Sequence, residues 1–335
     1  MKDTYYLFNP GRLSRQDNTL RFTPIDDKGI EQPAKFIPVE GLENLYVFGS
    51  LDANSALYNF LGKHRISVHF FDYYEHYTGS FQPKEYLLAG KMQVEQTRAY
   101  LDPARRLHLA RGFLEGGSAN MLRNMKYYAG RGRALDEHID AIGQYRTNMS
   151  GAKNIPALMG LEGNCRQTYY EAFDLILNAF EMAGRRKQPP ANEVNALVSF
   201  GNMVCYTQAL DAIYHTQLNP TISFLHEPGA RRYSLALDLA EVFKPILVDR
   251  TIFALINKRE IQARHFDDTL NGCFLNNTGK QIFLRALEER LQETIEHRVL
   301  RKKVSYKYLL RLECYKLVKY ILGMETTYRP FKIWW

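Results

Sequence analysis

The sequence predicts an α+β protein, with a small N-terminal β-sheet or sandwich domain over residues 1–82 and a larger all-helical domain over residues 83–335. Three observations lead to this fold class. Short runs rich in aromatic and β-branched residues, separated by turn residues, fill the first part. Beyond Phe81-Gln82-Pro83, long segments rich in Leu, Ala, Glu and Arg have helical periodicity. The composition, with 45% hydrophobic and 24% charged residues, is typical of a globular chain.

The N-terminal domain is expected to hold short strands joined by tight turns. Asn9-Pro10-Gly11 ends the first aromatic run, and Asp17-Asn18 separates two runs that are consistent with a hairpin. One helix is expected at Ser55–His64, with Ser55 as its cap. The predicted strands cover residues 4–8, 13–16, 19–23, 35–39, 45–48 and 67–71.

The second domain is expected to contain amphipathic helices with short connections. A basic, proline-containing loop over residues 184–190 separates two of them. The predicted helices cover residues 84–99, 103–127, 134–147, 156–182, 192–217, 234–257, 280–298 and 305–322.

The net charge of +8 is concentrated near the C-terminus. Residues 297–335 contain ten Lys or Arg and two acids, which accounts for the whole excess. A neutral body with a basic segment indicates a localised surface for a polyanion such as nucleic acid. A solvated helix face explains the same charges equally well, so the charge alone leaves both interpretations open.

Cysteine usage and the chain start favour a cytoplasmic protein. No CxxC pair and no Cys/His cluster has zinc spacing, so buried, reduced thiols are expected. The first residues lack a basic region followed by an apolar run, and no apolar stretch is long enough to span a membrane. The cysteines are Cys165, Cys205, Cys273 and Cys314.

Glu162 is the first candidate for chemistry. It lies at the margin of an apolar stripe on the helix predicted over residues 156–182. A carboxylate in that position is costly to desolvate unless it is paired or binds a cation. Arg166 follows four residues later, and a helix salt bridge between the two is the simpler interpretation of this segment alone.

A second cluster follows the turn at Asn219-Pro220. His226 comes after a short apolar run, and a lone histidine there is more often structural than a ligand. On the next helix, for which Ser234 is the expected cap, Asp238 and Glu241 share one face in mainly apolar sequence. Two neighbouring carboxylates need a cation between them, and Lys244, three residues after Glu241, is one candidate.

Together these residues predict a metal site. Carboxylates with one imidazole suit Mg²⁺ or Mn²⁺, and Mn²⁺ tolerates the nitrogen ligand better. A cation with open positions can polarise a phosphodiester and activate an attacking hydroxyl. Arg231 and Arg232 precede the acidic helix and are placed to contact a phosphate.

The chain resembles the CRISPR-associated integrase-endonuclease family, the larger universal protein of spacer acquisition. Family members share a Gly-x-Glu-Gly-like block, an Asn-x-Leu-Leu-Ser-x-Gly-like helix, and an apolar-His element followed by a Ser-Leu-x-x-Asp-x-x-Glu/Asp helix. The order of the blocks is the same here, and the resemblance covers essentially the whole chain. The matching blocks are GLEGNCRQTYYEAF (160–173), NEVNALVSFG (192–201), SFLHEPGARRYSLALDLAEVFKPILVD (223–249) and LNNTGK (275–280).

The resemblance implies a catalytic role for the helical domain. Residue by residue, it implies metal ligation by Glu162, His226 and Glu241, with Asp238 as a neighbouring catalytic-site acid that is a ligand or orients water. The last ligand is Asp in some relatives and Glu here. Phosphate contacts are expected from Arg231 and Lys244, and the basic C-terminal segment is expected to follow DNA without sequence preference.

The resemblance also implies the reaction and the assembly. The 3′-hydroxyl of a short incoming duplex would attack a phosphodiester of a repeat array, and water at the same site would make the protein an endonuclease in antiviral defence. An asymmetric homodimer, joined through the N-terminal β domains, would bind double-stranded DNA and the small CRISPR adaptation partner protein.

Two other functions remain open from the residues. A structure-selective nuclease on branched DNA would use the same metal site but would cut without joining. A nonenzymatic nucleic-acid-binding assembly protein would instead pair Glu162 with Arg166 and Glu241 with Lys244, and it would be indifferent to Mg²⁺ or Mn²⁺. No phosphate-binding loop, dinucleotide fingerprint or serine nucleophile motif supports a small-molecule enzyme.

Overall fold

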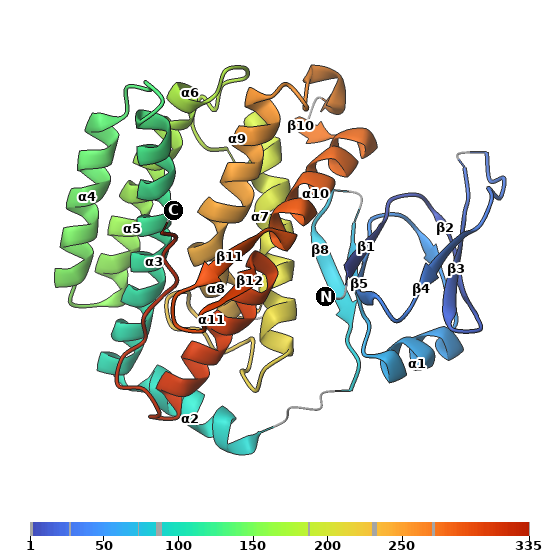
Figure 1. Cartoon of the computed structure of the whole chain (residues 1–335), viewed down its shortest axis with the longest axis horizontal. Helices are drawn as coiled ribbons and strands as arrows, with labels where there is room; N and C mark the ends of the chain where they lie inside the picture. Colours follow the sequence, from blue (N-terminus) through green and yellow to red (C-terminus); the bar gives the residue numbers. More distant parts are fainter. Residues whose placement is uncertain are drawn as a thin grey trace. The chain divides into compact units, whose positions relative to one another are not determined.

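A computed structural model describes residues 3–26, 28–72, 74–84, 89–186, 188–229, 233–269 and 272–334. The chain forms two compact units, Met1–Tyr86 and Leu87–Trp335 (Figure 1). The first is built on strands and the second is mostly helical, which confirms the predicted α+β class. The sequence predicts the boundary between the two domains after residue 82.

Within the described residues, the first unit contains two four-stranded sheets. One sheet has the order β1-β5-β7-β8, with β1–β5 and β5–β7 parallel and β7–β8 antiparallel. The other has the order β4-β3-β2-β6. The strands are β1 (Asp3–Leu7), β2 (Gly11–Gln16), β3 (Thr19–Pro24), β4 (Lys35–Pro38), β5 (Leu42–Val47), β6 (Leu51–Asp52), β7 (Ser67–Phe71) and β8 (Tyr77–Phe81).

The hairpin predicted at Asp17-Asn18 joins β2 and β3, and Asp17 adopts the left-handed φ of 55° that such a turn needs. The predicted helix is α1 (Ser55–His64), but its cap is Asn54, whose side chain accepts from the Leu57 N–H at 3.0 Å. The expectation of Ser55 as the cap was wrong by one residue. Apolar side chains of both sheets and α1 share one core.

The second unit has α3 as its longest helix (Figure 1). The buried helix α8 contacts both α3 and α7. The helices are α2 (Gly90–Leu101), α3 (Pro103–Ala129), α4 (Asp136–Gly151), α5 (Ile155–Glu171), α6 (Phe173–Ile176), α7 (Glu193–Tyr214), α8 (Ser234–Lys244), α9 (Arg250–Asn257), α10 (Asn277–Gln292) and α11 (Tyr306–Ile321).

Four predicted helices differ from the structure. The one predicted over 84–99 includes residues 85–88, which lie outside the described residues, and α2 begins at Gly90. The helix predicted over 156–182 ends with α5 and the short α6. The one predicted over 234–257 is α8 and α9, separated by the π-helical turn Pro245–Asp249. The last turns of the predicted helix 280–298 instead form β11 (Thr294–His297), which pairs with β12 (Lys302–Ser305). With a second hairpin, β9 (Phe266–Thr269) and β10 (Gly272–Leu275), the unit is mostly rather than entirely helical.

Pro245 explains the break after α8. A proline lacks the backbone N–H, and its ring crowds the carbonyl four residues earlier, here that of Glu241. Two asparagines of α3 bind carbonyls at this break: Asn120 Nδ2 donates to Val242 O at 2.8 Å and Asn124 Nδ2 to Pro245 O at 2.7 Å. These two hydrogen bonds therefore link the end of α8 to α3.

In the described part of the chain, no helix is both long enough and apolar enough to cross a membrane.

Candidate active site

Glu162 lies on α5, one turn before Arg166. Arg166 Nε donates to Glu162 Oε1 at 3.0 Å, and its terminal nitrogen pairs with Glu241 of α8. One guanidinium therefore joins two carboxylates that are 79 residues apart in the sequence. Both side chains are largely shielded, with 21% of Glu162 and 8% of Glu241 exposed.

Glu241 also pairs with the cation that the sequence suggested for it. Lys244 Nζ lies 2.7 Å from Glu241 Oε1. Burial by itself would raise the pKa of Glu241, but Arg166 and Lys244 outweigh it and lower that pKa to about 2. The carboxylate is therefore ionised across the whole physiological pH range.

Asp238 faces the turn that carries His226. Its carboxylate accepts from the backbone N–H groups of Phe224 at 2.7 Å and of Leu225 and His226 at 3.0 Å. Its Oδ1 also lies 2.8 Å from His226 Nδ1. The side chain is completely buried, so its acceptor positions are used inside the protein. Asp238 consequently fixes the turn and the imidazole.

His226 is oriented through Nδ1, which leaves Nε2 as the ring nitrogen for another partner. Burial lowers the pKa of His226, but the hydrogen bond and charge of Asp238, with Glu241, raise it above its usual value. The imidazole is therefore electrostatically coupled to both acids of α8.

Arg106 of α3, which the sequence did not single out, supports the same turn. Its Nε donates to Phe224 O at 3.0 Å and its terminal nitrogen lies 2.5 Å from Glu227. Tyr100 donates to the other oxygen of Glu227 at 3.1 Å. No periodicity or spacing relates α3 to a turn more than a hundred residues later.

A small cavity of about 10 Å³ lies beside the two carboxylates, lined by Glu162, Cys165, Arg166 and Glu241 with side chains of α3 and α4. This volume is close to that of a single water site. Arg166 contacts both of these carboxylates and offsets part of their charge.

A buried hydrogen-bonded chain continues from this region into the core. Asn124 Nδ2 donates to the Tyr169 hydroxyl at 2.9 Å, and that hydroxyl bonds to Asp249. Burial raises the pKa of Asp249 to about 7, although Arg166 and Tyr169 oppose the rise. In the sequence, Asp249 stands at the end of an apolar run. A single acidic residue in that position does not indicate a buried hydrogen-bonded network.

The other predicted positions divide into two groups. Lys244 is described and faces Glu241, whereas Arg231 and Arg232 lie outside the described residues. The expected cap Ser234 begins α8 without capping it, and its hydroxyl donates to Thr221 O at 2.9 Å. By contrast, the side chain of Asn192 caps α7, accepting from the Asn195 N–H at 3.0 Å.

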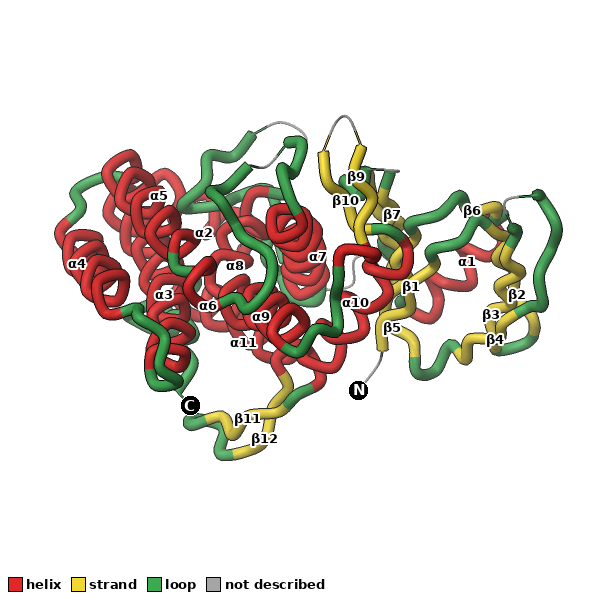
Figure 2. The backbone as a smooth tube through the Cα atoms, turned by 90° about the horizontal axis from the view of Figure 1, so that it is seen from above, coloured by secondary structure: helices red, strands yellow, loops and turns green. Residues whose placement is uncertain are grey.

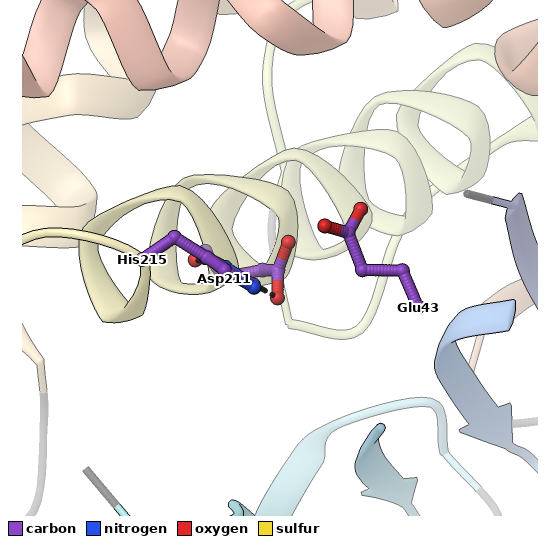
Figure 3. Close-up of side chains that lie close together, drawn as sticks. All are labelled: Glu43, Asp211 and His215. Carbon is purple, nitrogen blue, oxygen red and sulfur yellow. Dashed lines mark hydrogen bonds and ion pairs between the residues drawn. The ribbon is translucent and has the colours of Figure 1, made fainter. Parts of the chain in front are cut away.

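Another acid–histidine pair lies on α7, as Figure 3 shows. His215 is the C-terminal cap of that helix, and its Nδ1 lies 2.8 Å from the carbonyl of Asp211 and 3.5 Å from its carboxylate. Histidine in the last turn commonly binds such carbonyls, so a capping role explains the pair. Glu43, also drawn in Figure 3, belongs to β5 of the first unit.

Comparisons with known proteins give one family. The family described as "CRISPR associated protein Cas1" matches residues 5–289. A "CRISPR-associated endonuclease Cas1 2" of Moorella thermoacetica is 46% identical over 332 residues, with 99% of each chain covered.

Two solved structures resemble the whole chain. A Cas1 protein from Thermotoga maritima is 37% identical, with a TM-score of 0.86 and coverage of 97% of this chain and 98% of that one. A casposase bound to integration product has the same TM-score of 0.86 at 19% identity, covering 100% of this chain and 95% of that one, and shows the shared fold. The chain belongs to the Cas1 family of CRISPR-associated proteins.

Proposed function

We propose that this protein is a metal-dependent DNA integrase and endonuclease of CRISPR spacer acquisition. The observation that carries the proposal is the convergence of Glu162 and Glu241 on one cation, Arg166. The imidazole of His226, which Asp238 orients, also interacts electrostatically with Glu241. Relatives named CRISPR-associated endonuclease, 42% and 46% identical, support the chemistry.

The donor set fits Mg²⁺ or Mn²⁺. Glu162, Glu241 and Nε2 of His226 supply two carboxylates and one imidazole nitrogen, a set that suits Mn²⁺ especially. Both carboxylates already hold cationic groups in the ion pairs with Arg166 and Lys244. Binding of a divalent ion would therefore replace these contacts and free the two basic side chains.

When bound, the ion would polarise a phosphodiester and lower the pKa of the attacking hydroxyl. The protein's own residues do the positioning. Asp238 holds the His226 turn through three backbone N–H groups, and Arg106 supports it from α3. Lys244, once released from Glu241, is placed to contact a phosphate, and Arg231 is proposed for the same role.

Strand joining is a transesterification. The 3′-hydroxyl oxygen of the incoming duplex forms a bond to phosphorus of a repeat phosphodiester, the bond to the leaving 3′-oxygen breaks, and the proton moves from attacking to leaving oxygen. Water as the nucleophile gives hydrolysis. No nucleotide cofactor is consumed, because one phosphodiester replaces another.

For the assembly we propose a homodimer through the N-terminal unit, together with the small CRISPR adaptation partner protein. The face of β7 and β8 in that unit carries an open hollow lined by Tyr58, Phe70 and Phe81 with the small residues of β8. An open face with three aromatic side chains supports a protein contact there. Light scattering would test it by measuring the mass of wild type and Tyr58→Ala.

The test of the function is transfer of a labelled short duplex into supercoiled plasmid with Mn²⁺, Mg²⁺ or EDTA. We expect joined product with either ion, and its loss in EDTA and in Glu162→Gln, His226→Ala and Glu241→Gln. Glu171→Gln is the matched control, since Glu171 is exposed on the same helix as Glu162 and accepts from the exposed Gln167 at 3.0 Å.

The alternatives give different results in the same assay. Metal-dependent cutting without joining would identify a structure-selective nuclease. The pairs Glu162–Arg166 and Glu241–Lys244, which a nonenzymatic assembly protein would also have, are present. DNA binding that is indifferent to metal, with no bond made or broken in wild type, would therefore establish that role and refute the proposed chemistry.

A further inference from the structure

The hairpin of β11 and β12 has a well-defined loop. Thr294 pairs with Ser305 and His297 with Lys302, so residues 298–301 form the connection. His297 organises this connection, because its carbonyl accepts from the Arg301 N–H at 2.7 Å and its Nδ1 from the Leu300 N–H at 3.1 Å.

The base of the hairpin is anchored to the second unit. Val304 is buried, and Ser305 accepts from the Tyr308 N–H at 3.1 Å as the cap of α11. On the other side, the guanidinium of Arg298 lies 5.1 Å from the ring centre of Trp334. Figure 2 shows β11 and β12 extending away from the helices of this unit. The hairpin is thus a supported projection.

Its tip exposes apolar side chains. Residues 298–303 are all exposed, and Val299 and Leu300 are 83% and 42% exposed. Two adjacent aliphatic residues at the tip of a projecting loop are unfavourable in water and mark a contact site when they occur together. The described part of this chain leaves most of Val299 and much of Leu300 uncovered.

The charges around the tip identify the partner. Arg298 precedes the apolar pair, and Arg301, Lys302 and Lys303 follow it directly. Within residues 298–303 there is no acidic residue. Cations on both sides of an aliphatic tip match a duplex, in which phosphates border a groove and the bases are apolar on their faces.

We propose that this hairpin is a DNA-bending wedge, with Val299 and Leu300 inserted between base pairs of the bound duplex and the flanking cations on its phosphates. The idea rests on the proposed DNA function and specifies how part of the DNA is held. Insertion unstacks one base step and bends the duplex, and the binding is insensitive to sequence because no base edge is read.

The experiment uses the full chain and a 20-base-pair duplex labelled at both ends for energy transfer. Anisotropy in the same samples measures binding. We expect wild type to raise the transfer efficiency, and Val299→Ser/Leu300→Ser to bind but to lose most of that rise. Leu101→Ser, at another exposed leucine (70% exposed), is the matched control and should bend DNA like wild type.

The contribution of the flanking lysines can be measured separately, through the salt dependence of DNA affinity. Lys302→Gln/Lys303→Gln should reduce the slope of log affinity against log salt by about two, since each phosphate contact contributes about 0.9. The serine variant should keep the wild-type slope. Together, the two variants distinguish insertion of the apolar tip between base pairs from electrostatic attraction of the lysines to the phosphates.

Two results would overturn the wedge: wild type that binds DNA without bending it, or equal bending by the serine variant. In the second case, loss of self-association in that variant, measured by light scattering, would assign the tip to a protein contact. Strand joining in parallel samples keeps the proposals apart. Joining without bending refutes only the wedge, whereas bending without joining or cutting refutes only the proposed catalysis.

Discussion

Arg166 is the residue on which the candidate site depends in the absence of a metal ion. It contacts both Glu162 and Glu241, and these charges raise its pKa well above the usual value although burial opposes this. A buried ion pair contributes little net stability, but removing one partner leaves the other charges unpaired in a medium that solvates them poorly. Arg166 therefore offsets the repulsion between the two acids.

Arg166→Gln should destabilise the metal-free protein by about 3 kcal/mol because two buried carboxylates lose their common partner. Added Mn²⁺ should raise the unfolding temperature of this variant more than that of wild type, since the competing guanidinium is gone. Thermal unfolding with and without Mn²⁺ measures both effects. Arg98→Gln, at an exposed arginine paired with Glu95, is the control, and an equal Mn²⁺ shift in both variants would contradict the competition.

Asp249 predicts a specific pH dependence of stability. Its pKa of about 7 in the folded protein exceeds its unfolded value of about 3.9. The native state therefore binds more protons between these pKa values, and the contribution of Asp249 to stability falls as pH rises through that window.

Asp249→Asn keeps the size and the acceptor for Tyr169 but removes the ionisation. Relative to wild type, the variant should gain about 2–3 kcal/mol in free energy of unfolding between pH 5 and pH 8. Urea unfolding at the two pH values measures the difference. A constant difference between the proteins would show that Asp249 has an ordinary pKa.

At the level of secondary-structure elements, a glycine and two asparagines of α3 allow it to pack closely on α8 and to form hydrogen bonds with it. A Cβ on Gly117 would lie 2.7 Å from the carbonyl oxygen of Glu241, while Asn120 and Asn124 bind carbonyls beside the break at Pro245. Because α8 carries Asp238 and Glu241, its close packing on α3 sets where both acids lie.

Gly117→Ala should shift α8 and lower the free energy of unfolding by about 1–3 kcal/mol, because the clash is with backbone. Strand joining should fall with it. Gly143→Ala on α4 is the control, since nothing lies within 4 Å of its added Cβ, and it should be neutral or stabilising by up to about 1 kcal/mol. Unaltered stability and joining in Gly117→Ala would refute the close packing of α3 on α8.

At the scale of the whole molecule, the end of the chain is part of the core of the second unit. The N–H of Ile333 donates to Asn120 at 2.8 Å, and the Tyr328 hydroxyl donates to the buried Glu313 at 2.6 Å. Phe331 stacks on Phe243 of α8, with ring centres 5.7 Å apart. The basic C-terminal segment thus has buried side chains that pack into the core of the second unit, as well as exposed cations.

Removal of residues 327–335 should lower the stability of the second unit by roughly 5 kcal/mol, because three large side chains lose their burial. Hydrogen exchange of α3 and α8 should accelerate strongly. Exchange in Met1–Tyr86 should stay as in wild type, since that unit has its own core. Acceleration confined to the new C-terminus would contradict the supporting role.

Features that depend on local pattern could be predicted from the amino-acid sequence. Periodicity, turn residues and motif order predict the α+β class, most strands of the first unit and α1. They also supply the candidates Glu162, His226, Asp238 and Glu241. The elements they missed, β6, β8 and the two late hairpins, are short and pair with partners chosen by tertiary contacts.

The contacts among the candidate residues depend on how distant segments fold together. Local spacing offered Arg166 to Glu162 and Lys244 to Glu241, but only folding placed Arg166 against Glu241 as well. Likewise, the sequence offers Asp238 as a possible ligand, and only the fold brings three backbone N–H groups onto its oxygens. The physical reason is that a buried charge is governed by whatever surrounds it in space, and residues from distant segments supply most of those surroundings.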